Sequence, residues 1–208
     1  MTQSPTYYYP NRMGRIILLS MEEVMGRNGL QALLNLASLP EFVAAFPADD
    51  TQAGFSFSAL SALTETLEQA YGPHGGRGLS TRIGRACFNY GMRQYGVQLG
   101  LTEMAFRLLP MPQKLLAGAQ AFAGLFNNFT DQRVHVEVED GKILWHIERC
   151  PLCWERRAQD PVCHLAVGLL QEALYWLSGG KVYGVEEQTC IAAGDAACTI
   201  VINQTPLS

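Results

Sequence analysis

Five of the six cysteines of this 208-residue chain lie in its last sixty residues, and no other feature restricts the fold as strongly. They are Cys150, Cys153, Cys163, Cys190 and Cys198. Thiolates that share one metal ion must each come within about 2.3 Å of it, so the fold has to bring separate segments together. The spacing of the cysteines therefore constrains how the C-terminal part of the chain is arranged.

The residues around Cys190 and Cys198 predict two short strands joined by a turn. Val, Ile and Thr are frequent on the outer sides of both cysteines, and a Gly-Asp pair lies between them. Such a pair of strands would hold the two cysteines close together, with Glu187 three residues before Cys190. Cys163, at the start of a separate predicted helix, could supply a further ligand, and the set suits one tetrahedral ion.

Three interpretations of the cysteines are open. Disulfides suit an even number of cysteines in a secreted scaffold, but we see no leader segment. Free cysteines can pack in a core as small hydrophobic residues, and this fits Cys87 best because it stands alone in a helical pattern. Crowded cysteines in a reducing compartment usually serve metal or redox chemistry, so we favour a metal site for the C-terminal group.

The C-terminal motif resembles that of a known family. Glu187-x-x-Cys190 is followed by Gly194-Asp195-x-x-Cys198, and Pro161-Val162-Cys163 lies upstream. This arrangement is similar to the 4-vinyl reductase-type domain, which is also described as a hydrocarbon-binding domain. Softer matches at residues 9–15 and 82–85 extend the resemblance over most of the chain.

The resemblance carries expectations about the site and the fold. Relatives include a protein of bacteriochlorophyll synthesis and the phenol-sensing domains of bacterial transcription activators, in which three cysteines and one glutamate hold zinc. The ligands implied here are Cys163, Glu187, Cys190 and Cys198. Cys150 and Cys153 lie outside that set, either as a second feature or as rivals for the same ion. The implied fold is shared with ligand-binding sensors and with subunits of a vesicle-tethering complex, which commonly form dimers.

Composition limits the class of protein. Apolar residues make up 48% and charged residues 16% of the chain, which is typical of a well-buried globular protein. A net charge of −4 argues against nucleic acid as the main partner, because phosphate contacts need clustered Lys and Arg. No run of eighteen apolar residues occurs, so we expect no membrane span. We expect a cytoplasmic location because no leader is visible.

Hydrophobic periodicity predicts a series of helices after an extended arm at residues 1–15. We assign residues 16–208 to a single domain, and its first two helices, within 16–39, are a candidate homodimer contact. The chain should break between these two helices at residues 26–28, and Gly75 to Gly78 predicts a flexible connection further on. The helices are expected at residues 16–25, 29–39, 56–71, 80–99, 110–126 and 161–177.

The clearest strand pattern is a hairpin from Arg133 to Glu148, with its turn at Asp140-Gly141. Valines alternate with polar residues before the turn, and an apolar strand follows it. Two closing strands, near 181–188 and 197–203, complete a four-stranded antiparallel sheet. We therefore predict an α+β fold in which helices pack on one side of a small antiparallel sheet.

The helix at 110–126 combines small residues with large aromatic ones, which leaves room for a bulky apolar ligand. Tight helix packing uses the same composition, so core packing is the alternative interpretation. Arg82 and Arg85 could meet an acidic or hydroxyl group at the mouth of a pocket, or could simply face solvent. The candidate lining residues are Phe88, Tyr95, Phe122, Phe126, Trp145 and Trp176.

The leading functional hypothesis is a zinc-stabilised, homodimeric module that holds a hydrophobic or aromatic small molecule as a sensor or carrier. The second is an enzyme that reduces a tetrapyrrole vinyl group, or a carrier of that pigment precursor in bacteriochlorophyll synthesis. Reduction needs an electron source, and the chain has no GxGxxG. An iron–sulfur cluster on Cys150, Cys153 and Cys163 would be the visible candidate for one. The third hypothesis is a protein-interaction domain that regulates another protein.

Overall fold

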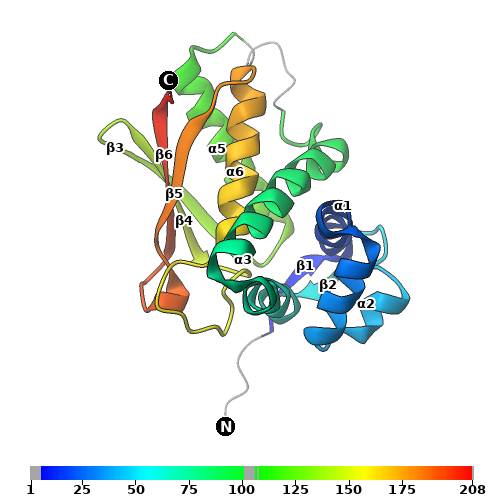
Figure 1. The fold of residues 1–208 in the computed structure, drawn as a ribbon. Helices are drawn as coiled ribbons and strands as arrows, with labels where there is room; N and C mark the ends of the chain where they lie inside the picture. The colour runs from blue at the N-terminus through cyan, green and yellow to red at the C-terminus, as the bar shows by residue number, and fades with distance from the viewer. Residues whose placement is uncertain (1–5, 101–105, 107, 208) are drawn as a thin grey trace.

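The computed structural model describes residues 6–100, 106 and 108–207. Its main sheet is antiparallel, with four strands in the order β3-β4-β6-β5. The strands span Arg133–Glu139 (β3), Lys142–Arg149 (β4), Tyr183–Thr189 (β5) and Cys198–Pro206 (β6). Helices α5 (Met111–Phe129) and α6 (His164–Ser178) lie along one face of this sheet, and α3 (Phe57–Tyr95) packs on α6 (Figure 1). The predicted α+β fold is confirmed.

Two long helices bend sharply, each at a glycine. Helix α1 (Asn11–Leu36) bends at Gly26, where φ is 76°, and α3 bends at Gly72, where φ is 72°. A positive φ strains residues that carry a side chain, so glycine is the residue that permits these bends. The break expected within residues 26–28 is confirmed at Gly26.

The flexible connection expected at residues 75–78 is wrong, because these residues are helical. The second half of α3 begins directly after Gly72, at Pro73. A Cβ atom at Gly76 would lie 2.6 Å from the Cα of Glu68, so only glycine lets the helix fold back on its first half so tightly. The glycines here serve close packing, and the two helices expected at 56–71 and 80–99 become one bent element.

The N-terminal part of the chain contains a second, two-stranded sheet that the sequence did not suggest. Strand β1 (Tyr8–Pro10) pairs antiparallel with β2 (Ala53–Ser56). The amide of Asn11 donates to the carbonyl of Gln52, and that of Arg12 to the carbonyl of Asp50. These bonds satisfy two free amides of the first turn, so α1 begins at Asn11. The extended arm expected to reach residue 15 is therefore helical from Asn11 onward.

The remaining elements agree with the sequence-based expectation of a short helical piece after residue 40. Helix α2 spans Pro40–Ala44, and a short 3-10 helix, η1, spans Ile191–Ala193 between the last two strands. Helices α3 and α6 cross with their backbones in contact, because a Cβ at Gly84 would overlap the carbonyl oxygen of Leu165. A Cβ at Gly168 would likewise overlap the carbonyl oxygen of Thr81.

The apolar face of α1 is buried against the rest of the chain. The buried apolar residues of this helix are Met13, Ile16, Ile17, Leu18, Met21, Leu30, Leu33 and Leu34. Most of the apolar surface considered as a dimer contact is therefore covered within one chain. Homodimer formation and the assignment of residues 16–208 to one domain stay predictions. Over the described residues, no helix has the length and apolar character needed to cross a membrane.

Candidate metal centre and cavity

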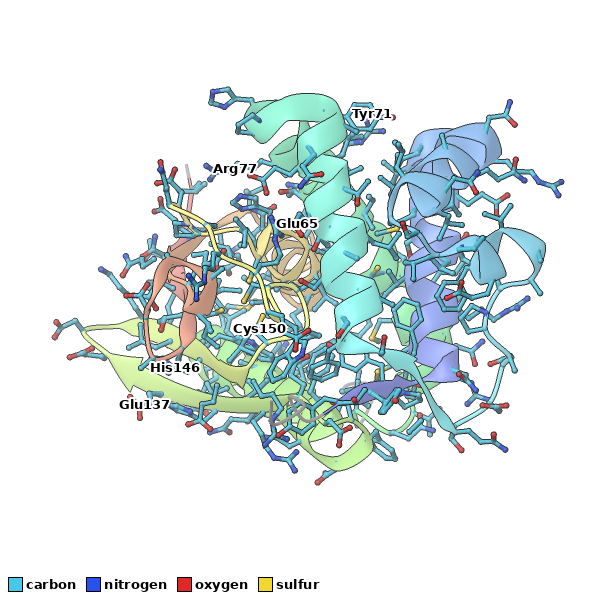
Figure 2. The ribbon with its side chains drawn as sticks, turned by 90° about the horizontal axis from the view of Figure 1, so that it is seen from below. Glu65, Tyr71, Arg77, Glu137, His146 and Cys150 are labelled. Atoms are coloured by element: carbon cyan, nitrogen blue, oxygen red, sulfur yellow. The ribbon has the colours of Figure 1, made fainter. Side chains whose placement is uncertain are left out.

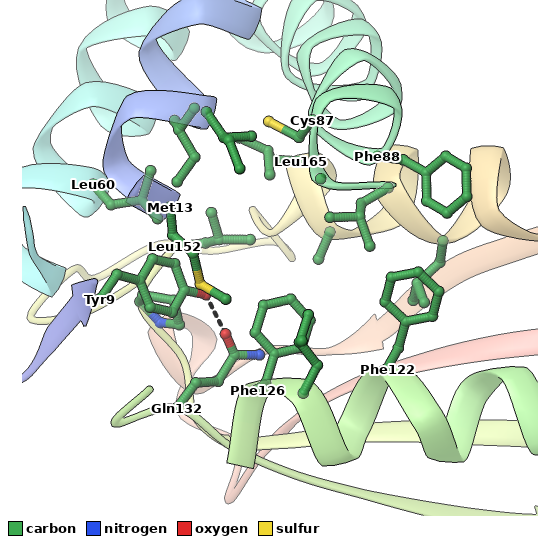
Figure 3. A pocket seen from close by; sticks show the side chains of 18 of the residues that line it. Tyr9, Met13, Leu60, Cys87, Phe88, Phe122, Phe126, Gln132, Leu152 and Leu165 are labelled. Atoms are coloured by element: carbon green, nitrogen blue, oxygen red, sulfur yellow. Dashed lines mark hydrogen bonds between the residues drawn. The ribbon is translucent and has the colours of Figure 1, made fainter. Parts of the chain in front are cut away.

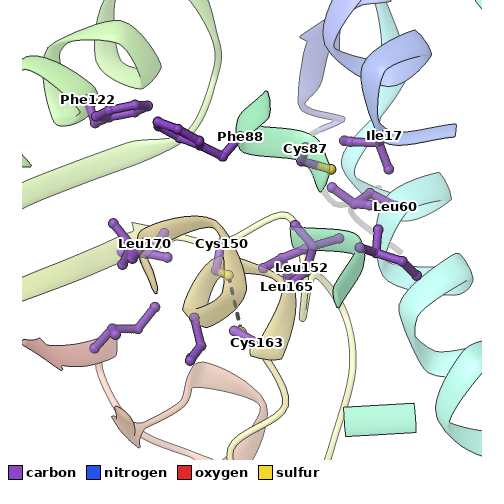
Figure 4. Close-up of a cluster of buried hydrophobic side chains, with 14 of the residues drawn as sticks. Ile17, Leu60, Cys87, Phe88, Phe122, Cys150, Leu152, Cys163, Leu165 and Leu170 are labelled. Atoms are coloured by element: carbon purple, nitrogen blue, oxygen red, sulfur yellow. Dashed lines mark hydrogen bonds between the residues drawn. The ribbon is translucent and has the colours of Figure 1, made fainter. Parts of the chain in front are cut away.

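Five buried cysteines converge from four segments of the chain. Cys150 and Cys153 come from the loop after β4, and Cys163 directly precedes α6. Cys190 follows β5, and Cys198 begins β6. The loop, the helix start and the two strand ends meet below α6, where Cys150 and Cys163 face each other (Figure 4).

Three of the sulfur atoms form a nearly equilateral triangle. Cys163 Sγ lies 3.9 Å from Cys190 Sγ and 3.7 Å from Cys198 Sγ, and the latter two sulfurs are 3.8 Å apart. A tetrahedral zinc ion with Zn–S bonds of about 2.3 Å has neighbouring sulfurs about 3.8 Å apart. The triangle therefore has the dimensions of one face of a zinc–thiolate tetrahedron.

Glu187 lies beside this triangle with one carboxylate oxygen free. Its Oε2 accepts a hydrogen bond of 2.7 Å from the amide of Cys163, whereas its Oε1 is buried and has no hydrogen-bond partner. Burial, and then the Cys190 sulfur, raise the pKa of Glu187 to about 9. A buried carboxylate with an unpaired oxygen needs either a proton or a cation, and a metal ion would supply the cation. Glu187, Cys163, Cys190 and Cys198 have donor atoms within 4.8 Å of one another.

Cys150 and Cys153 lie in contact with the same triangle. Cys150 Sγ is 3.5 Å from Cys163 Sγ, and Cys153 Sγ is 3.4 Å from Cys198 Sγ. A second possible set, made of these four cysteines, also has its donor atoms within 4.8 Å of one another. The structure thus brings together all six residues considered from the sequence, in two overlapping sets that share Cys163 and Cys198.

The turn between β5 and β6 fixes the positions of two of these sulfurs. The amide of Cys190 donates to the Asp195 carboxylate at 2.8 Å, and the hydroxyl of Thr189 donates to the carbonyl of Ala197 at 2.8 Å. These bonds close the turn, as expected from the Gly-Asp pair. They hold Cys190 and Cys198 on the same side of the strand pair, which confirms the predicted strand arrangement.

An apolar cavity of about 100 Å³ lies between the metal-side loops, α1, α3, α5 and the sheet (Figure 3). Four of the aromatic residues predicted to line a pocket do so: Phe88, Phe122, Phe126 and Trp145. Gly91 also lines it, and a Cβ at this position would meet nothing within 4 Å. The cavity wall further includes Tyr9, Met13, Ile16, Ile17, Leu60, Cys87, Tyr95, Leu125, Gln132, Ile147, Pro151, Leu152, Leu165, Ala166, Leu169 and Leu170.

Three residues proposed for the pocket lie outside this wall. Trp176 is 44% exposed, and its ring packs on Phe88 with the centroids 6.3 Å apart. Arg82 is exposed, and the exposed Arg85 donates to the side chain of Gln171 at 2.8 Å. Neither arginine is among the residues that line the cavity, so the arrangement leaves the solvent-facing alternative for both.

The cavity wall contains a few polar groups. The Tyr9 hydroxyl donates to the side-chain oxygen of Gln132, and both residues are buried (Figure 3). The Tyr95 hydroxyl is buried and has no hydrogen-bond partner. Sequence reasoning included Tyr95 but missed Tyr9 and Gln132, because their pairing joins residues 123 positions apart. The one available signal was the softer family match that begins at Tyr9.

The metal-side loops and the cavity share a wall. Pro151 and Leu152, which line the cavity, lie between Cys150 and Cys153. Leu165 and Ala166 also line it, and they follow Cys163 in the first turn of α6 (Figure 4). Any change in the position of the sulfur cluster would therefore move part of the cavity wall.

Residues 145–204 match the family model of the 4-vinyl reductase domain. The C-terminal region is therefore a domain of this family, which confirms the resemblance noted from its cysteine motif. The match begins at Trp145 in β4 and includes all the residues of both possible metal sets. No protein among those with curated descriptions gave a significant match to the chain.

Several solved structures share the fold. An H-NOX protein from S. oneidensis in the Fe(II)NO ligation state has a TM-score of 0.58 and 12% identity, covering 93% of this chain and 99% of its own. An Fe(II) unliganded H-NOX protein from K. algicida has a TM-score of 0.57 and 13% identity, with coverages of 94% and 97%. The phenol-responsive sensory domain of the transcription activator PoxR, solved with phenol, has a TM-score of 0.52 and 21% identity, with coverages of 83% and 88%.

Proposed function

Because the C-terminal region is a 4-vinyl reductase domain, we propose that this chain is a zinc-stabilised sensory domain that holds a small hydrophobic or aromatic molecule. The observation that carries the proposal is the apolar cavity whose wall includes the loops of the cysteine cluster. Ligand sites are mostly apolar concavities with a few placed polar groups. The cavity here has that composition, with Tyr9, Tyr95 and Gln132 as its polar groups.

The size of the cavity favours a ligand with one ring. Cavities of about 150 Å³ lined by Leu, Ile and Phe hold benzene, and this cavity measures about 100 Å³. A tetrapyrrole has four linked pyrrole rings and would need several times this space. The alternative of a vinyl reductase or pigment-precursor carrier is therefore less well supported than binding of a small aromatic molecule.

The unpaired hydroxyl of Tyr95 favours a ligand that can form a hydrogen bond. An unpartnered buried polar group costs about 1–3 kcal/mol, which a bound hydroxyl would recover. The PoxR sensory domain of similar fold was solved with phenol. We therefore propose a phenol-like molecule as the ligand class, with its ring among Phe88, Phe122 and Phe126 and its hydroxyl toward Tyr95.

We propose that Cys163, Glu187, Cys190 and Cys198 hold one zinc ion. The triangle of three sulfurs, with sides of 3.7–3.9 Å, and the free Glu187 oxygen support this set. Four protein ligands leave no open position, which is typical of structural zinc. Cys150 and Cys153 would then donate S–H hydrogen bonds to the bound thiolates. The four-cysteine set remains the alternative.

An iron–sulfur cluster is less well supported as the group at this site. The ligand cysteines of a cluster bind different irons, so the cluster core has to fit between their sulfurs. Here neighbouring sulfurs approach to 3.4–3.9 Å, which leaves room for a single ion. This argument also weakens the reductase hypothesis, which needs an electron source.

The test of ligand binding is a matched pair of glycine substitutions. Gly91 and Gly124 both lie within helices and both have open space around a built Cβ, but only Gly91 is among the residues lining the cavity. Gly91 lies on the α3 face that also carries Phe88 and Tyr95, so Gly91→Leu should fill the cavity. We expect calorimetry to show phenol or toluene binding that falls at least tenfold in Gly91→Leu and is retained in Gly124→Leu, with zinc content unchanged in both. Equal binding by both variants, or no binding by the unmodified protein, would contradict the proposal.

A further inference from the structure

The outer face of the sheet, away from the helices and the cysteine cluster, carries three side chains that converge. His135 on β3 is directly opposite His146 on β4, and Glu137 lies two residues after His135 on the same face. Figure 2 shows His146 and Glu137 together at this edge of the sheet. We propose that His135, Glu137 and His146 form a second metal site, which takes a divalent first-row transition cation.

The two imidazoles direct the same ring nitrogen toward one carboxylate. His135 Nε2 lies 3.6 Å from Glu137 Oε1, and His146 Nε2 lies 3.8 Å from Glu137 Oε2. The rings stack with centroids 4.5 Å apart and an interplanar angle of 19°. One donor atom from each of the three side chains lies within 4.8 Å of the others. An ion bound by both Nε2 atoms and the carboxylate would thus need only small side-chain rotations.

The other nitrogen of each ring already has a neighbour that can orient it. His146 Nδ1 is 3.0 Å from the hydroxyl of Thr199 on β6, and His135 Nδ1 is 3.1 Å from the Glu148 carboxylate. Metal-binding histidines usually donate the N–H of the second nitrogen to a carboxylate or another oxygen, which leaves the first nitrogen free for the ion. Both histidines have this arrangement, with Nε2 as the free nitrogen.

The Nε2 atom of His146 is buried and has no hydrogen-bond partner. Two stacked imidazoles cannot both carry a proton without strong repulsion. Burial first, and then the ring of His135, lower the pKa of His146, which favours the neutral ring that a metal ion requires. A cation between the two Nε2 atoms would satisfy both rings and balance the charge of Glu137.

The donor set indicates the kind of ion. Imidazole suits zinc, copper, iron and nickel, and a single carboxylate with two histidines leaves coordination positions open for water. The set contains no thiolate, so it differs in chemistry from the cysteine cluster on the other side of the sheet. The two sites can therefore be loaded and measured separately, and this inference does not rest on the proposed ligand-binding function.

The test is a Ni²⁺ titration of the zinc-loaded protein by calorimetry at pH 7.5, with zinc measured by mass spectrometry before and after. We expect one Ni²⁺ per chain without loss of zinc. His135→Ala and His146→Ala should each reduce the Ni²⁺ affinity at least tenfold. His74→Ala, at an exposed histidine of α3, should leave it unchanged.

Glu137→Gln guards against a loss of fold in the histidine variants. The side chain of Glu137 is 62% exposed, so its replacement should leave the unfolding temperature unchanged while the Ni²⁺ affinity falls at least fivefold. Binding that is equally strong in Glu137→Gln and His146→Ala, or that falls equally in His74→Ala, would overturn the proposal. So would the absence of stoichiometric Ni²⁺ binding by the unmodified protein.

Discussion

At the scale of single residues, the five clustered cysteines differ in what surrounds them. Cys163 contacts three other sulfurs, and its amide also holds Glu187 in place. Cys150 and Cys153 each make one contact shorter than the sides of the triangle, as expected of thiols that donate to bound thiolates. Loss of a ligand and loss of a donor should therefore have different effects on the ion.

The first prediction separates these two roles. Cys190→Ser should abolish stoichiometric zinc and lower the unfolding temperature, because it removes one corner of the sulfur triangle. Cys150→Ser and Cys153→Ser should keep one zinc per chain and weaken its binding by about 10–100-fold, the usual effect of losing a group that supports a ligand. Zinc content after dialysis against a chelator measures the difference.

X-ray absorption on the unmodified protein gives the complementary measurement. We expect three sulfur ligands and one oxygen at the zinc ion. Four sulfurs and no oxygen would replace Glu187 and Cys190 by Cys150 and Cys153. Unchanged zinc content and stability in Cys190→Ser would contradict the assignment outright.

At the scale of elements, the crossing of α3 and α6 positions both the cavity and the metal-side end of α6. Gly84 and Gly168 lie where the two backbones touch, and neither position has space for a Cβ atom. Side chains of α3 and α6 that lie next to this crossing form the cavity wall. The contact cannot be widened locally, because the atoms that a methyl group would meet belong to the backbone of the other helix.

The second prediction concerns this contact. Gly168→Ala should destabilise the protein by about 1–3 kcal/mol, the usual cost of overpacking, although alanine is the better helix former. Gly78→Ala is the matched control, since Gly78 is an exposed residue of α3 and its Cβ would meet nothing within 4 Å. That variant should gain up to about 1 kcal/mol. Denaturant unfolding compares the two, and a stabilised Gly168→Ala would show that the helices can separate without cost.

The elements that the sequence predicted are those set by local patterns. The hairpin of β3 and β4 follows from alternation and a Gly turn, and the closeness of Cys190 and Cys198 follows from the strands that flank them. The pairing of β1 with β2, the Tyr9–Gln132 contact and the stacked His135–His146 pair depend on register and on distant segments. Trp176 was placed in the pocket by helical spacing, but spacing alone does not say which side of a crossing a residue occupies.

At the scale of the whole molecule, the cysteine cluster and the cavity belong to one structural unit. The cluster joins the loop after β4, the start of α6 and the ends of β5 and β6. Leu152 and Leu165, on two of these segments, form part of the cavity wall. A metal ion that fixes the segments would also fix the shape of the cavity, so metal and ligand binding should depend on each other.

The last prediction is this coupling. Removal of zinc by a chelator should weaken phenol binding at least about fivefold, the lower end of usual coupling between two sites. Since the coupling must be reciprocal, saturating phenol should strengthen zinc binding by the same factor. Chelator competition with and without phenol measures the second effect on the metal-loaded, folded protein, even if the metal-free protein unfolds. Gly91→Leu is the control, because a filled cavity should leave the zinc affinity insensitive to phenol. Equal zinc affinities with and without phenol in the unmodified protein, at phenol concentrations that saturate it, would show that the shared wall transmits nothing between the two sites.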